Sequence, residues 1–307
     1  MFLVYCLRAL PYSSAVPHGY QLVFGFPSVY PLTGGELVLV KVAFKILVGF
    51  VTGALIVLAI SLYLSNYYLR EQERLAGAGD LRGARAEVEQ AARLDPFSSA
   101  PPSSMAYLEL REGRTEAAAE AFREAIRRDP YNYKNYMALG DLQRQQLGDP
   151  KAAAESYREA LRHNPNASAV VSRLAGALMS DEDLEGAKAQ YQWLQERGKI
   201  PLKDLYYLGR IQVRLEEPEK AIEIFEEARE GAATDLESLN ESQKAQREAF
   251  MESLDLAIAD ALVVQGSYAE AREILAQSSA EQAPSILALL DEDSQSYQES
   301  VLDAPIS

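Results

Sequence analysis

The chain has 307 residues, a formal net charge of −15, one cysteine and two histidines. With Cys6 alone and His18 far from His163, a disulfide framework and a cysteine-based metal site are excluded, and we expect neither a metal nor a cofactor. The acidic charge argues against nucleic acid as a partner, because a negative surface repels phosphate.

Residues 1–37 are apolar and rich in Tyr, Pro and Gly, with no helical or alternating period. A signal peptide would need an early positive cluster, and Arg8 comes too late for one. The codons of Gly34-Gly35-Glu36 can form a bacterial ribosome-binding sequence, so one hypothesis is that this irregular N-terminal segment is not translated. The other interpretation is an ordinary disordered or membrane-associated extension.

Residues 38–65 are expected to form a transmembrane helix. The apolar run from Ile46 to Leu64 is uninterrupted, and its helical length of about 29 Å is close to the roughly 30 Å hydrocarbon core of a bilayer. A buried helix of a globular protein would need a polar face, and this run has none. We therefore expect residues 42–64 to contact lipid.

The flanks of this run bear on orientation and self-association. Lys41 and Lys45 precede it, which favours a cytoplasmic N-terminus and extracytoplasmic repeats, although several arginines follow it. Gly49 and Gly53 have GxxxG spacing, which permits a homodimer in lipid. We expect a single-pass protein of the bacterial cell membrane.

A small-large-small stripe recurs beyond this segment. In the stretch from Gly113 to Pro130, Ala118, Phe122 and Ala125 lie on one face of a helix. The same pattern recurs at Ala84/Val88/Ala91, Ala153/Tyr157/Ala160, Ala187/Tyr191/Leu194, Ala221/Phe225/Ala228 and Ala271/Leu275/Ser278. The steps from Ala84 onward are 34, 35, 34, 34 and 50 residues, which indicates a repeat array.

The half-repeat before each stripe has a complementary pattern, as in Tyr136, Leu139 and Gly140. On these residues the chain resembles the tetratricopeptide repeat family, whose units combine an aromatic and Leu-Gly helix with an Ala, Phe, Ala and Pro helix. The resemblance implies an all-α fold: a right-handed superhelical solenoid of helix-turn-helix repeats, preceded here by one transmembrane helix. Most first helices lack the family's Trp and second aromatic, and the last units lack the closing proline.

The resemblance covers residues 66–278, or about six units. The final 50-residue step implies an insertion near residues 230–249, which we expect to lengthen the first helix of the sixth unit because breakers are absent after Gly231. Residues 279–307 are acidic and poor in apolar side chains, and we expect a disordered tail there.

No phosphate-binding loop, nucleophile elbow or HExxH pair is present, and we expect this chain not to be an enzyme. The resemblance instead implies a concave groove lined by first helices. The Leu-Gly register places a basic, tyrosine-containing strip in or near that groove: Lys134, Met137, Arg144, Arg173, Lys203, Tyr206, Arg210 and Arg214.

Such a strip could hold a peptide with acidic groups, because Arg binds carboxylates bidentately and Tyr supplies rigid apolar area. On this interpretation Arg173 and Arg210 are exposed and contribute little to stability. The alternative is that these cations pair with acidic residues of adjacent units and recognise nothing.

These patterns favour a membrane-tethered scaffold that binds a protein or peptide partner during envelope complex assembly, maturation or quality control. The alternative is a non-catalytic localising or regulatory subunit of a membrane-associated enzyme complex. Both rest on architecture rather than on a site.

Overall fold

The computed structural model describes residues 34–234 and 236–306, with side chains from Lys41 onward. These residues form fourteen α-helices and one short 3-10 helix, and no strand occurs among them. The predicted all-α fold is therefore confirmed. The prediction for residues 1–33 lies outside the described residues. The chain divides into two parts, Met1–Leu58 and Ala59–Ser307.

Helix α1 (Gly34–Gly77) contains the apolar run. It begins within the segment expected to be irregular, since residues 34–37 are already helical. A window within Lys41–Gly77 has a mean hydropathy of 2.5, and apolar side chains such as Phe50 are exposed along it. By length and composition this helix could cross a membrane.

The last turns of α1 belong to the repeat array. Ser65, Gln72 and Ala76 are buried, and Ser65 Oγ donates a hydrogen bond to the carbonyl oxygen of Ala91 at 3.1 Å. Ala76 shares a small apolar cluster with Ala84, Val88 and Leu108 of the next helices. The end of α1 thus serves as the first helix of the first hairpin.

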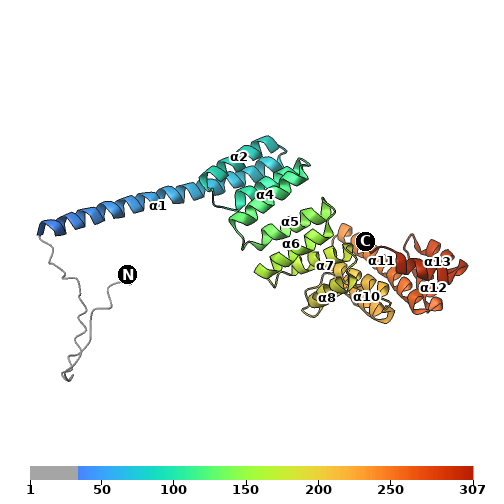
Figure 1. Ribbon diagram of the computed structural model, residues 1–307. Coiled ribbons are helices and arrows are strands. Elements are labelled where there is room, and N and C mark those ends of the chain that lie inside the picture. The colour runs from blue at the N-terminus through green and yellow to red at the C-terminus, as the bar shows by residue number, and fades with distance from the viewer. Residues whose placement is uncertain (1–33, 235, 307) are drawn as a thin grey trace, which may run out of the picture. The chain divides into compact units, whose positions relative to one another are not determined.

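The helices after α1 form hairpins stacked in chain order, and α2 (Leu81–Leu94) completes the first of them (Figure 1). The helices that follow α2 are α3 (Ala100–Arg111), α4 (Thr115–Arg128), α5 (Tyr133–Gln145), α6 (Pro150–His163), α7 (Ser168–Ser180), α8 (Leu184–Gln195), α9 (Leu202–Arg214), α10 (Pro218–Ala233), α11 (Glu241–Gln265) and α12 (Tyr268–Gln277).

The predicted stripe forms the core of the stack. Its large members Phe122, Tyr157, Tyr191 and Phe225 are at most 1% exposed. Each lies against the preceding first helix, where the residue after the leucine must be small. A Cβ added to Gly140 would lie 2.6 Å from Cε1 of Tyr157, so the glycine allows the two helices to approach closely.

Helix α11, which includes part of the inserted segment, is 25 residues long. A short 3-10 helix (Leu236–Ser238) precedes it. Asn240 starts α11 with a reciprocal capping box: its side chain accepts from Gln243 N, and the Gln243 side chain accepts from Asn240 N.

The prediction of a disordered tail is wrong. Residues 279–307 include α13 (Ala283–Glu292) and α14 (Ser294–Asp303). Leu290 and Val301 are 0% and 4% exposed and belong to the main core cluster, and Asp293 caps α14 by accepting from the backbone of its first turn. A few apolar residues suffice because the neighbouring repeats already provide the surface on which they pack.

Candidate functional site

The first helices define the inner face of the stack. Neighbouring first helices contact each other, as α5 does α7 and α9 does α11. The residue after each Leu-Gly pair, or its equivalent, recurs at steps of 34, 35, 34 and 50 residues. We call this set the inner ladder: Tyr107, Asp141, Gly176, Arg210 and Asp260.

At the C-terminal end of the ladder, Arg210 pairs with Asp260. Arg210 Nη1 lies 2.6 Å from Asp260 Oδ2, and the two side chains are only 12% and 13% exposed. Tyr297 of α14 donates its hydroxyl to the other oxygen, Asp260 Oδ1, at 2.7 Å. Burial and the nearby Asp260 carboxylate raise the pKa of Tyr297, so its phenol stays neutral and able to donate.

Arg214 and Tyr206 also contact other parts of the chain. Arg214 Nη1 donates to the carbonyl oxygen of Ala304 at 2.5 Å, after the end of α14. The ring of Tyr206 is half-buried between Phe225 and Phe250, with centroid distances of 6.0 and 6.3 Å. Both side chains are thus half-buried and already have partners within the chain.

The side chain of Lys203 is exposed. Its Nζ lies 5.3 Å from the ring centroid of Tyr207, on the same helix. The ammonium therefore remains accessible while its stem lies along an aromatic ring.

In the middle of the ladder, Arg173 Nε lies 2.9 Å from Asp141 Oδ1, which also accepts from the Tyr157 hydroxyl at 2.7 Å. Arg144 occupies the space beside Gly176: a Cβ there would lie 3.5 Å from Arg144 Nη1. Arg173 and Arg210 therefore each pair with an acidic residue of an adjacent unit. This is the geometry of the alternative interpretation, in which these cations hold neighbouring units together rather than a peptide. Met137 is half-buried against the core.

The N-terminal end of the inner face remains open. Lys134 is exposed there beside a cavity of about 460 Å³ between the end of α1, α3 and α5. Tyr107 is 54% exposed, and its ring contacts that of Phe122 edge-on at 5.2 Å. Burial of part of its ring and the Asp141 carboxylate raise the pKa of Tyr107.

Asn135 lines the same cavity and is 5% exposed. Its Oδ1 accepts from Ser103 Oγ at 2.6 Å, whereas its Nδ2 has no hydrogen-bond partner among the described residues. An unpartnered buried amide is costly, so this donor is well suited to a ligand carbonyl.

The repeat pattern of the sequence does not single out Ser103, Tyr107 or Asn135. The period itself could have found Tyr107, because it lies 34 residues before Asp141. The second unit obscured this relation, since its first helix opens with Pro101-Pro102 and has Met105-Ala106 in place of Leu-Gly.

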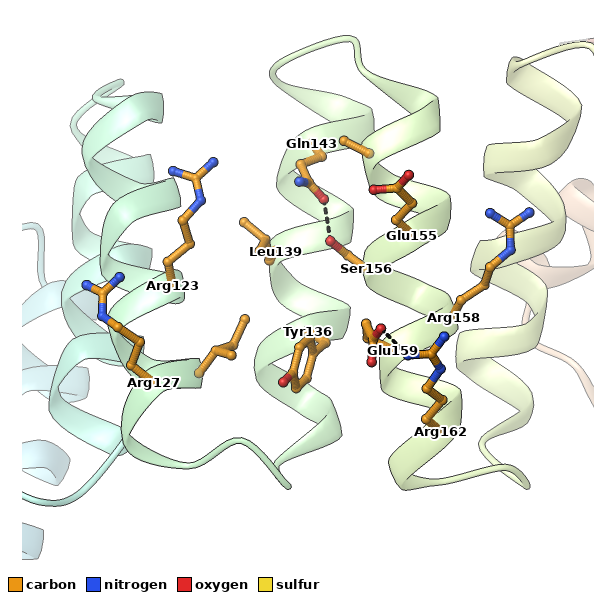
Figure 2. Close-up of a pocket in the computed structure, with 12 residues that line it drawn as sticks. Arg123, Arg127, Tyr136, Leu139, Gln143, Glu155, Ser156, Arg158, Glu159 and Arg162 are labelled. Atoms are coloured by element: carbon orange, nitrogen blue, oxygen red, sulfur yellow. Dashed lines mark hydrogen bonds and ion pairs between the residues drawn. The ribbon is translucent and has the colours of Figure 1, made fainter.

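A second cleft of about 640 Å³ opens on the other side of α5, between α4 and α6 (Figure 2). Tyr136 and Leu139 of α5 lie between Arg123 and Arg127 of α4 and the polar side chains of α6. The arginines are largely neutralised within their own helices. Arg127 pairs with Glu120 and Glu124, and Arg162 pairs with Glu159 at 2.5 Å.

Within the described residues, no group of three or more His, Cys, Asp or Glu side chains is arranged to hold a metal ion. The polar groups of the inner face are instead arranged as ion pairs and single hydrogen-bond donors. Such groups can contact a polypeptide.

Comparison with known families gives one match. The family described as Tetratricopeptide repeat matches residues 73–133, 103–168, 142–198 and 172–235, which together cover more than half of the chain. A comparison with curated proteins finds no match.

The chain is similar to several solved structures. PilW, described as a widely conserved type IV pilus biogenesis factor, is 17% identical over 73% of this chain and 98% of its own, with a TM-score of 0.51. YrrB, a TPR protein with an unusual peptide-binding site, is 22% identical over 52% and 82%, with a TM-score of 0.45. MamA 41-end from Desulfovibrio magneticus RS-1 is 19% identical over 56% and 97%, with a TM-score of 0.49.

Proposed function

Because this chain belongs to the tetratricopeptide repeat family, we propose that it is a membrane-tethered scaffold. It binds a protein or peptide partner during assembly, maturation or quality control of a bacterial envelope complex. Repeats of this family act by presenting a surface to another polypeptide. The observation that carries the proposal is the open inner face at Tyr107, Lys134 and Asn135.

The chemistry of this surface favours an extended peptide. Tyr107 offers a rigid ring that is half exposed, and the free amide of Asn135 can donate to a main-chain carbonyl. Lys134 is exposed and could attract a carboxylate. The Asp141 carboxylate lies near Tyr107 and further along α5 than Lys134, so an acidic group of the peptide belongs at the Lys134 end.

The tether is the apolar part of α1. Its length and hydropathy support a single span. Lys41 and Lys45 before the span favour repeats on the extracytoplasmic side. A span restricts the scaffold to the membrane surface, which raises the chance of encounter with partners that are also membrane-bound. The acidic body, with a net charge of −15 for the chain, limits non-specific contact with anionic headgroups.

The test uses a photo-crosslinking amino acid placed at position 107 of the full chain in its native membrane. We expect a discrete crosslinked partner, and we expect Asn135→Ala to weaken its yield. The matched control places the crosslinker at Tyr131, which is 80% exposed in the turn between α4 and α5. Equal products from positions 107 and 131 would contradict the proposed surface.

The same experiment separates the two functional interpretations. A localising subunit would give one enzyme partner at fixed stoichiometry, whereas an assembly or quality-control scaffold would give several client proteins. Protease added to intact spheroplasts tests the orientation, since extracytoplasmic repeats should be degraded.

A further inference from the structure

Helix α14 lies on the inner face, across two first helices. It contacts both α9 and α11. Tyr297 donates to Asp260, and the Gln298 side chain accepts from the Tyr268 hydroxyl at 2.9 Å. Beyond the helix, the Ala304 carbonyl accepts from Arg214. This end of the inner face is thus filled by the chain's own C-terminal segment.

The apolar part of this contact is small. Val301 is the only buried residue of α14, whereas α9 buries seven residues. Tyr297 and Ile306 add partly buried surface to the same cluster. A helix held by so few side chains belongs to the part of a protein that opens at low free-energy cost.

Release of α14 would leave no buried charge unpaired. Arg210 and Asp260 belong to α9 and α11, so their ion pair is independent of α14. Asp260 loses only the Tyr297 hydroxyl, which water can replace once the helix has left. Arg214 holds a main-chain carbonyl, a group that every peptide possesses.

We propose that the inner face at α9 and α11 is a helix-binding site, that α14 is its built-in ligand, and that an amphipathic helix of a protein partner replaces α14. This inference rests on the proposed scaffold function and specifies a second partner surface for it. The partner helix needs a tyrosine and, four residues later, a β-branched residue, as Tyr297 and Val301 are placed. It should also lack basic residues, as residues 293–306 do, because Arg210 and Arg214 line the site.

The arrangement makes binding conditional. A tethered competitor acts at an effective concentration on the order of millimolar, so an outside helix with ordinary affinity is excluded while α14 is docked. Weakening α14 alone should therefore raise the apparent affinity of the site for an outside helix at least tenfold.

The test uses the full chain in detergent and a fluorescent peptide with the sequence of residues 293–306. Val301→Asp places a charge at the buried contact and should release α14. Ser300→Asp is the matched control, because Ser300 is exposed on the same helix. We expect fluorescence anisotropy to show binding to Val301→Asp that is at least tenfold tighter than to the wild type or to Ser300→Asp.

Hydrogen exchange of residues 294–303 reports whether α14 has left. Fast exchange in Val301→Asp without peptide binding would overturn the proposal, and so would equal peptide affinity for all three chains. Slow exchange like that of α9 in both the wild type and Val301→Asp would make α14 a permanent cap and overturn it too. If Val301→Asp unfolds the last repeats, Tyr297→Ala takes its place, with the same expected result.

Failure here is distinguishable from failure of the proposed function. The probe peptide comes from this chain, so the result does not depend on a partner being found at Tyr107. Conversely, loss of the crosslink at position 107 would leave the peptide experiment unaffected.

Discussion

Arg210 and Asp260 occupy equivalent positions in neighbouring repeats and pair with each other at 2.6 Å, although 50 residues separate them in the chain. Both side chains are nearly buried. The pair therefore links the fifth unit to the sixth across the longest step of the array. Its environment differs from that of the pair between Arg173 and Asp141, whose side chains are 37% and 28% exposed.

This difference in burial predicts different costs of removal. Arg210→Gln leaves Asp260 without its cation and should destabilise the chain by about 3 kcal/mol. Arg173→Gln, the matched control, should cost only about 0–1 kcal/mol because its pair is solvated. Urea unfolding of both variants measures this, and equal costs would contradict the role assigned to burial. The expectation that Arg210 is exposed is wrong, since its side chain is 12% exposed.

Two glycines of first helices should respond oppositely to alanine. At Gly209 an added Cβ would overlap the ring of Phe225, so Gly209→Ala should destabilise by about 1–3 kcal/mol. At Gly176 the nearest atom is the mobile end of Arg144 at 3.5 Å, so Gly176→Ala should gain up to about 1 kcal/mol of helix propensity. Thermal melting distinguishes them, and a loss at both positions would contradict the packing.

Asp204 gives a pH-dependent prediction. It is 7% exposed, and its Oδ2 has no partner among the described residues. Burial raises its pKa, against the opposing hydrogen bond from Ser172. Because the pKa is higher in the folded state, this carboxyl favours folding at a pH below its unfolded pKa of about 3.9. That stabilisation is lost as the pH rises through the folded-state pKa.

Asp204→Asn should therefore stabilise the chain at pH 7 by about 1 kcal/mol, with a smaller gain near pH 4. The control is Asp183→Asn at an exposed helix N-cap, where the two residue types cap equally well. Melting curves at both pH values test this. A gain for Asp204→Asn that did not shrink in acid would show that charge burial is not its cause.

The apolar part of α1 predicts membrane retention of the full chain after a carbonate wash. Replacing Val51 and Leu55 by arginine should release the chain, because each charge at the middle of a span costs about 2.5–3.5 kcal/mol. Arginines at Asn66 and Tyr67, which are exposed beyond the apolar run, serve as the control. Retention of the first variant would argue against a span.

The repeat period predicted most of the fold, because one helix face of each unit must be small, large and small for hairpins to stack. Ala118, Phe122 and Ala125 are buried as that pattern requires. The fate of residues 279–307 could not be predicted this way. Leu290 and Val301 have no regular spacing of their own, and they are ordered only by a surface that earlier repeats create.

The candidate site was predicted less well for a related reason. The Leu-Gly register places side chains on the correct face but does not say which of them meet. Arg210 meets Asp260 only because the insertion leaves the end of α11 in register with α9. Tyr107 was missed because its helix has Met105-Ala106 in place of the Leu-Gly pair. Asn135 was missed because the register does not reveal that its buried amide lacks a partner.

The long helix α11 has a consequence for how the protein can vary. Its extra turns precede the part that packs against the other repeats. From Glu241 to Gln246 every residue is exposed except Lys244, which is half-buried. An extension at that end adds about 1.5 Å per residue without shifting the register of Asp260. Whole turns could therefore be added to or removed from this end of α11 during evolution. A foreign helical epitope could also be inserted there, and the contacts between the repeats would not change.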